Sequence, residues 1–253
     1  LALYTGDDDG LPLPPGWKNK RFNDPDVKKA YVRYVIRAVE HFRPAYLCFA
    51  VEVNLLRGKS PHLWEDYLEL QEHTYRAIKA RFPNLPAFVS ICGGYLVEGF
   101  SQDFDARDQQ RAARQALTYS DMYAVSLYPY LSNYGTGPYP GDLLEQILAF
   151  SDKPPAFAET GYTADSMDFM GRTIDGTPQK QEAYLEDLFA ACEEHHCAFI
   201  INFLRRDYDR AIPPAGQPVW FWLWKDTGLV DENDRPRPSY SLWLRTLARP
   251  YQR

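Results

Sequence analysis

Ala45-Tyr-Leu-Cys-Phe-Ala-Val-Glu-Val-Asn54 is an apolar stretch that closes on one carboxylate, Glu52. A second stretch, Pro154-Pro-Ala-Phe-Ala-Glu-Thr-Gly161, ends in the same way at Glu159. An ionised glutamate is rarely buried without a reason, because its charge is costly to remove from water. Two carboxylates that each close a strand-like segment therefore predict a paired acid site.

Short apolar runs of this kind recur along the chain. They begin at residues 46, 87, 122, 156 and 198, a spacing of 34 to 42 residues. Nearly continuous hydrophobicity predicts strands buried on both faces, as parallel strands under helices are. Helix starts with a capping side chain followed by proline occur at Asp24-Pro25, Ser60-Pro61 and Thr177-Pro178.

Strands alternating with helices at this spacing form the βα repeat of a barrel. With an opening strand at residues 1–5 and a last helix near 239–247, six βα units are visible. We expect an α/β fold of the (β/α)8 TIM-barrel type, lacking its first two βα units, in which residues 1–253 form one domain. Either two further units precede residue 1, or six units form a shortened barrel whose open strand edges are covered in a homodimer.

The charge and hydropathy of the chain argue against two classes of partner. The 253 residues carry a net charge of -6, so a polyanion such as nucleic acid would be repelled. No apolar run reaches the roughly 18 residues that a membrane span needs. We therefore expect neither a nucleic acid nor a membrane as partner. The cysteines show no metal-ligand spacing and are expected to be free thiols, although a bridge between Cys192 and Cys197 stays open.

At its two glutamates the chain resembles the retaining glycoside hydrolases of clan A, which are (β/α)8 barrels. In that clan a general acid/base glutamate ends strand four and a nucleophilic glutamate ends strand seven. If residues 1–5 form strand three, these positions are Glu52 and Glu159. The resemblance implies that Glu52 is the acid/base and Glu159 the nucleophile.

Two further segments carry the resemblance. Ser126-Leu-Tyr-Pro-Tyr130 is similar to the strand-six segment of the endo-β-1,4-galactanase family, in which an aromatic hydroxyl neighbours the nucleophile. The segment 226–243 is similar to the end of many clan A enzymes. The resemblance implies that Tyr128 orients the nucleophile and that Tyr130 lies close to the substrate.

One position departs from the clan's pattern. Clan A enzymes usually place an asparagine directly before the acid/base, where it binds the sugar 2-hydroxyl, but here Val51 precedes Glu52. Valine cannot make that hydrogen bond. Asn54 has the same strand parity as Glu52 and is the candidate to contact the substrate in its place.

Aromatic side chains supply the remaining candidates for substrate binding, because sugar rings stack their apolar faces on them. Every second residue from 220 to 224 is a tryptophan: Trp220, Trp222 and Trp224. In a strand they would share one face and could form the floor of a sugar subsite. Alternatively, they pack against the barrel. Tyr95 follows strand five and could line the cleft. Asp207, after the last strand, could contact sugar hydroxyls, hold an ion or pair with arginine.

These patterns predict a retaining glycoside hydrolase that cleaves a β-linked oligo- or polysaccharide by double displacement with two glutamates. Retention requires the two carboxyl groups to lie roughly 5 to 5.5 Å apart. No cofactor and no metal are expected. The alternatives are a non-catalytic carbohydrate-binding barrel and an assembly protein built from a shortened barrel. A polysaccharide substrate favours a secreted or periplasmic location, while the sugar, the linkage and the compartment stay open.

Overall fold

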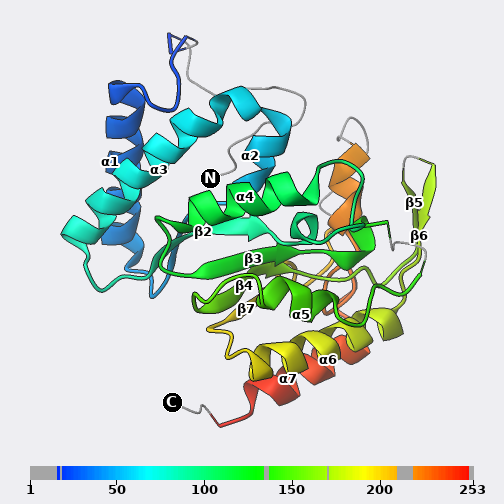
Figure 1. Cartoon of the computed structure of the whole chain (residues 1–253). Coiled ribbons are helices and arrows are strands. Elements are labelled where there is room, and N and C mark those ends of the chain that lie inside the picture. The colour runs from blue at the N-terminus through cyan, green and yellow to red at the C-terminus, as the bar shows by residue number, and fades with distance from the viewer. Residues whose placement is uncertain (1–15, 18, 134–136, 170, 210–218, 251–253) are drawn as a thin grey trace.

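A parallel five-stranded sheet in the order β1-β2-β3-β4-β7 forms the centre of the molecule (Figure 1). The computed structural model describes residues 16–17, 19–133, 137–169, 171–209 and 219–250. The strands are β1 (Leu47–Ala50), β2 (Ala87–Cys92), β3 (Tyr123–Leu127), β4 (Pro155–Thr160) and β7 (Ile200–Asn202). Each of the five strands overlaps one of the apolar runs, which confirms the barrel-type α/β fold as an incomplete barrel. The strand predicted at residues 1–5 lies outside the described residues.

Helices connect these strands and cover one face of the sheet. The α-helices are α1 (Pro25–Phe42), α2 (Asn54–Lys59), α3 (Trp64–Arg81), α4 (Ala106–Leu117), α5 (Leu143–Leu148), α6 (Pro178–Glu194) and α7 (Pro238–Leu247). Short 3-10 helices occur at η1 (Pro61–Leu63), η2 (Gly94–Leu96), η3 (Pro129–Leu131) and η5 (Val219–Trp224). An antiparallel hairpin of β5 (Met167–Phe169) and β6 (Arg172–Ile174) follows β4. It projects beyond the sheet in Figure 1.

Two of the three predicted helix starts are confirmed by their capping bonds. The Asp24 carboxylate accepts a hydrogen bond from the amide of Asp26 (2.9 Å) before α1, and the Thr177 hydroxyl accepts one from Lys180 (3.1 Å) before α6. Ser60 makes no such capping bond. The proline after it therefore opens the 3-10 turn η1, and α3 begins only at Trp64.

The two faces of the sheet are buried by different partners. Val89, Val125 and Phe157 belong to the main core, which the helices also form. Phe88 and Ala124 belong to a separate small cluster on the opposite, inner face. This alternation follows from the two-residue period of a strand.

The inner face borders a cavity of about 300 Å³, which we call the inner cavity. Phe88, Ser90, Ser126, Ala158 and Glu159 are among the residues that line it. Most of the described residues in its wall are therefore apolar, and Glu159 is the carboxylate among them. Because parallel strands run in one direction, their carboxyl ends bring loop residues together at one edge of the sheet.

Candidate active site

Glu52 lies directly beyond β1 in a left-handed backbone conformation. Its φ angle is +49°, which costs a residue with a Cβ atom of the order of 1–3 kcal/mol. Two bonds to the neighbouring strand hold this conformation: the Glu52 amide donates to Oγ of Ser90 (2.9 Å), and the Val53 amide donates to the Ser90 carbonyl (3.0 Å). Such strain collects at functional sites, so the backbone independently favours a functional Glu52.

Glu159 reaches the inner cavity through an irregularity in β4. Val125 pairs with Phe157, but the next residue of β3, Ser126, pairs with Glu159, so Ala158 is an extra residue in the strand. Ala158 and Glu159 both line the inner cavity as a result. Bulges of this kind re-aim side chains beside active sites. The ladder of β1 also shifts, before Ala50, so both strands that lead to a glutamate are irregular.

The carboxylate of Glu159 has a specific hydrogen-bond partner. The Tyr128 hydroxyl donates to its Oε1 at 2.5 Å. Burial raises the pKa of Glu159, and the hydrogen bond from Tyr128 acts in the opposite direction. Tyr128 is therefore placed as the sequence predicts, in contact with the proposed nucleophile.

Glu52 and Glu159 act on the same neighbouring groups. Burial is the largest cause that raises the pKa of Tyr128; the charge and hydrogen bond of Glu159 follow, and then the charges of Tyr130 and Glu52. Burial, the charge and hydrogen bond of Glu52, and the charge of Glu159 raise the pKa of the Cys92 thiol. Glu52 follows β1 and Glu159 lies near the end of β4, so both stand at the edge of the sheet formed by the carboxyl ends of the strands. Cys92 and Ser90 were not among the sequence candidates, although both lie at the end of a predicted strand.

The structure corrects the role expected for Asn54. It is the first residue of α2 rather than a strand residue, so its parity with Glu52 has no meaning. Its side chain is fully buried, and its amide donates to the Cys92 carbonyl (3.2 Å) and to Oε1 of Gln109 (2.9 Å). Its Oδ1 accepts a hydrogen bond from the Cys92 amide (2.8 Å). Asn54 ties the segment after Glu52 to the end of β2 and does not face a substrate.

The tryptophan-rich segment also differs from expectation. Val219–Trp224 forms the 3-10 helix η5 and not a strand, so the three tryptophans do not share one strand face. The side chain of Trp220 lies outside the described residues. Trp222 is 41% exposed. Trp224 packs edge-on against Tyr128, with 5.9 Å between ring centroids, and therefore lies beside the Glu159 partner.

The two candidate tyrosines lie together around a second cavity of about 420 Å³, which we call the rim cavity. Tyr130 is buried, donates to the Leu223 carbonyl (2.9 Å) and is among the residues that line the cavity. Tyr95 is half-buried, and its hydroxyl donates to Oδ2 of Asp103 (3.3 Å). Both residues remain candidates for substrate contact.

Asp207 is not available for contact with sugar hydroxyls. Its carboxylate is buried and bound by Arg237 at both oxygens, at 3.0 and 2.6 Å, and it also accepts the Gly228 amide (2.8 Å). Of the three roles considered for Asp207, pairing with arginine is the one that the structure shows.

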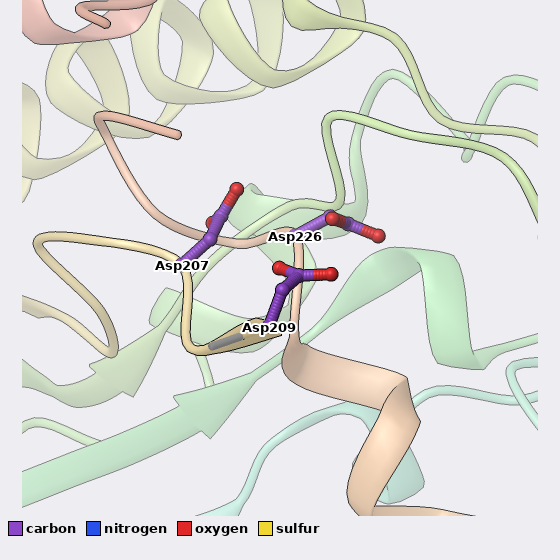
Figure 2. Close-up of side chains that lie close together, drawn as sticks. All are labelled: Asp207, Asp209 and Asp226. Carbon is purple, nitrogen blue, oxygen red and sulfur yellow. The ribbon is translucent and has the colours of Figure 1, made fainter. Parts of the chain in front are cut away.

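Asp207 belongs to a cluster of three carboxylates (Figure 2). Oxygen atoms of Asp207, Asp209 and Asp226 lie within 4.8 Å of one another. Lys225 bridges Asp226 (2.5 Å) and Asp209 (3.3 Å), while Arg237 binds Asp207. Each carboxylate in the cluster thus has a cationic side chain beside it, and the protein itself supplies most of the compensating charge.

Comparison with known proteins places this geometry in a fold class. No family model matches the chain, and no curated protein matches it. Among solved structures the chain is similar to the GH53 catalytic domain of Ignisphaera aggregans, with a TM-score of 0.63 and 21% identity over 91% of this chain and 67% of that one. The neighbouring structures thus include a glycoside hydrolase barrel, and at this identity the likeness shows the fold alone.

Two further neighbours are β-glucuronidases. The enzyme of Ruminococcus gnavus matches with a TM-score of 0.60 and 11% identity, over 90% of this chain and 36% of that chain. The enzyme of an uncultured Clostridium sp. matches with a TM-score of 0.56 and 12% identity, over 87% and 35%. The chain therefore spans about a third of the length of these two glucuronidases. Separately, none of the helices within the described residues is both long and apolar enough to cross a membrane.

Proposed function

We propose that this protein is a retaining glycoside hydrolase with Glu52 as general acid/base and Glu159 as nucleophile. The observation that carries the proposal is geometric: Glu52 lies directly beyond β1 with its amide bonded to Ser90, and Glu159 is bonded to Tyr128. Ser90 and Glu159 line the same inner cavity. The similarity to solved glycoside hydrolase domains supports the choice of chemistry. The segment that resembles the galactanase family agrees with the GH53 neighbour.

The proposed reaction proceeds by double displacement. Glu159 attacks the anomeric carbon while Glu52, as an acid, protonates the departing glycosidic oxygen. Water then attacks the glycosyl-enzyme ester, and Glu52 takes the proton of that water. The hydrogen bond from Tyr128 holds Oε1 of Glu159, which leaves Oε2 as the attacking oxygen. A fixed nucleophile reacts faster because less orientational freedom is lost at the transition state.

The aromatic residues beside this pair suit a β-linked oligo- or polysaccharide. Trp224 lies next to Tyr128, and Tyr95 and Tyr130 border the rim cavity. Rings of this kind bind the apolar faces of sugars. We propose that the substrate lies across the carboxyl ends of β1 to β4 and contacts these rings.

The test compares Glu52→Gln and Glu159→Gln on substrates with different leaving groups. An activated aryl β-glycoside needs no protonation, so Glu52→Gln should still form the glycosyl-enzyme and give a burst of phenol. Glu159→Gln should lose several orders of magnitude on every substrate, because no nucleophile remains. Glu186→Gln, an exposed carboxylate of α6, is the matched control and should keep wild-type rates.

The stereochemistry of the product tests the retaining mechanism separately. Proton NMR of the first turnover should show the β-anomer. A first product with the α-configuration would mean inversion, and a crystal structure would then show the carboxylates roughly 6.5–9.5 Å apart instead of roughly 5–5.5 Å. Wild-type rates in Glu159→Gln would reject the hydrolase proposal altogether.

Two alternatives each follow from one observation. Val51 removes the asparagine that clan A enzymes place before the acid/base, which favours a carbohydrate-binding barrel; intact oligosaccharide would then bind and no product would form. Tyr46 and Ile201 border the inner cavity and are 44% and 51% exposed, which favours coverage of this face by a second copy. Sedimentation of the chain as a monomer would count against that assembly.

A further inference from the structure

The rim cavity lies between three chain segments that are far apart in sequence. Tyr95 comes from η2, Tyr130 from η3, and Phe169 and Arg172 from the β5–β6 hairpin. The cavity has a volume of about 420 Å³. Sites for small organic ligands are concave, largely apolar, and carry a few polar groups that fix orientation. The rim cavity has this composition.

Two side chains of opposite charge line the cavity. Arg172 forms no ion pair within the part of the chain that the structure describes, and one of its donors is bound to the Ser132 carbonyl (3.1 Å). A guanidinium has five N–H donors in a rigid plane, so donors remain for a ligand. Asp103 accepts hydrogen bonds from Ser101 (2.8 Å) and Tyr95 (3.3 Å), and a carboxylate has further acceptor sites.

The rim cavity adjoins the proposed catalytic pair through its two tyrosines. The ring of Tyr130 packs edge-on against Tyr128, with centroids 6.0 Å apart, and Tyr128 binds Glu159. On the other side, burial and then the charges of Cys92, Asp103 and Glu52 raise the pKa of Tyr95. A ligand in the rim cavity would therefore be a near neighbour of a sugar between the two glutamates.

We propose that the rim cavity is a subsite for an uncharged sugar unit of the substrate, with Arg172 and Asp103 as the residues that select it. This inference rests on the proposed function for the direction of the bound oligosaccharide. Sugar hydroxyls both donate and accept hydrogen bonds, which matches one cationic and one anionic side chain. The aromatic lining takes the apolar face of the ring. An acidic polymer is disfavoured because Asp103 lines the cavity and the chain carries a net charge of -6.

Binding and catalysis test this subsite separately. Glu159→Gln, alone and with Arg172→Ala or Asp103→Ala, is titrated by calorimetry with the β-1,4-linked tetraoses of galactose, glucose, mannose and xylose. At least one tetraose should bind, and each added substitution should weaken it by about 10- to 100-fold, the loss typical of one or two hydrogen bonds to a charged group. Arg172→Lys should recover part of the affinity. Arg33→Ala, an exposed arginine of α1 far from the hairpin (Figure 1), is the control.

Kinetics on a small substrate separate the two proposals. Arg172→Ala should lower kcat/KM on the tetraose far more than on an aryl β-monoglycoside, because the small substrate does not reach the rim cavity. Tetraose affinity unchanged by both substitutions, or no tetraose bound at all, would overturn the subsite. If the substitutions weaken tetraose binding but the wild-type protein cleaves nothing, the subsite stands and the hydrolase proposal fails.

Discussion

The hydroxyl of Tyr128 donates a hydrogen bond of 2.5 Å to Oε1 of Glu159. Tyr128 stands just beyond β3, and Glu159 lies in the irregular part of β4, so the bond joins adjacent strands at their carboxyl ends. It fixes the carboxylate that we propose as nucleophile.

Tyr128→Phe should lower kcat by about 10- to 100-fold, because a hydrogen bond to a charged group typically contributes about 1.5–3 kcal/mol. KM should change little, since Tyr128 acts on the nucleophile. Steady-state kinetics on an aryl β-glycoside measure both parameters. Tyr123→Phe removes another buried tyrosine hydroxyl, bonded to the Ile147 carbonyl (3.0 Å), and should reduce stability but not kcat. Equal kcat values for the two variants would contradict the role of Tyr128.

Glu159→Gln should raise thermal stability at neutral pH. Burial raises the pKa of Glu159 in the folded state, so the stability linked to its protonated form is fully present below its unfolded pKa and is lost as pH rises through the folded pKa. A neutral glutamine removes this loss. The midpoint of unfolding should therefore exceed that of wild type at pH 7, by about 2–4 °C for each kcal/mol recovered.

The same comparison at acidic pH provides the control. The difference between Glu159→Gln and wild type should shrink as pH falls below the folded pKa, because Glu159 is then protonated in wild type as well. Melting curves from pH 4 to pH 8 give the profile. A difference that stays constant over this range would show that burial of the charge is not its cause.

Glu52→Gly should stabilise the fold and abolish hydrolysis of unactivated substrates. Glycine adopts a φ of +49° without the Cβ clash, so the free energy of unfolding should rise by about 1 kcal/mol. Glu52→Gln keeps the Cβ atom and the strain, and it is therefore the matched control. Denaturant unfolding of both variants gives the comparison, and equal stabilities would show that the left-handed backbone stores no strain.

Ser90→Ala should impair the proposed acid/base without touching its carboxylate. The change removes the hydroxyl that accepts the Glu52 amide. Loss of one hydrogen bond should cost about 1 kcal/mol of stability. The pH profile of kcat/KM should also change on its alkaline limb, which reports the acid. Ser90→Thr keeps the hydroxyl and should restore the profile; a wild-type profile in Ser90→Ala would exclude a positioning role.

Arg237→Ala should destabilise the protein by about 3–5 kcal/mol, because it leaves the buried carboxylate of Asp207 without its partner. Arg206→Ala removes a more exposed pair with Asp234 and should cost no more than about 1 kcal/mol. Denaturant midpoints of the two variants make the comparison. Similar losses would mean that the Arg237 pair behaves as a surface pair.

The strands and the main helices could be predicted because each depends on local patterns. The run that begins at residue 87 becomes β2, which starts at that residue, and the capping residues Asp24 and Thr177 mark the starts of α1 and α6. Other elements, such as the segment at residues 219–224, could not be predicted from local patterns. The alternating tryptophans would share one face if they formed a strand, yet η5 forms there.

The positions of the two glutamates could be predicted only in part. Strict alternation in β4 places Phe157 and Glu159 on the same face, toward the helices. The extra residue Ala158 breaks this alternation, and only the pairing with β3 reveals it. Asn54 was misplaced for a similar reason, because the chain leaves the strand before Glu52 and enters α2. Neither change has a signal in the local sequence.

At Glu52 the proposed catalytic role and the stability of the fold make opposite demands, because the left-handed backbone there disfavours glutamate. Asparagine, aspartate and glycine fit that conformation better than glutamate does. Lineages that no longer need catalysis would gain stability by adopting one of these three. The residue that homologues carry at position 52 would then distinguish those that catalyse the reaction from those that only bind sugar.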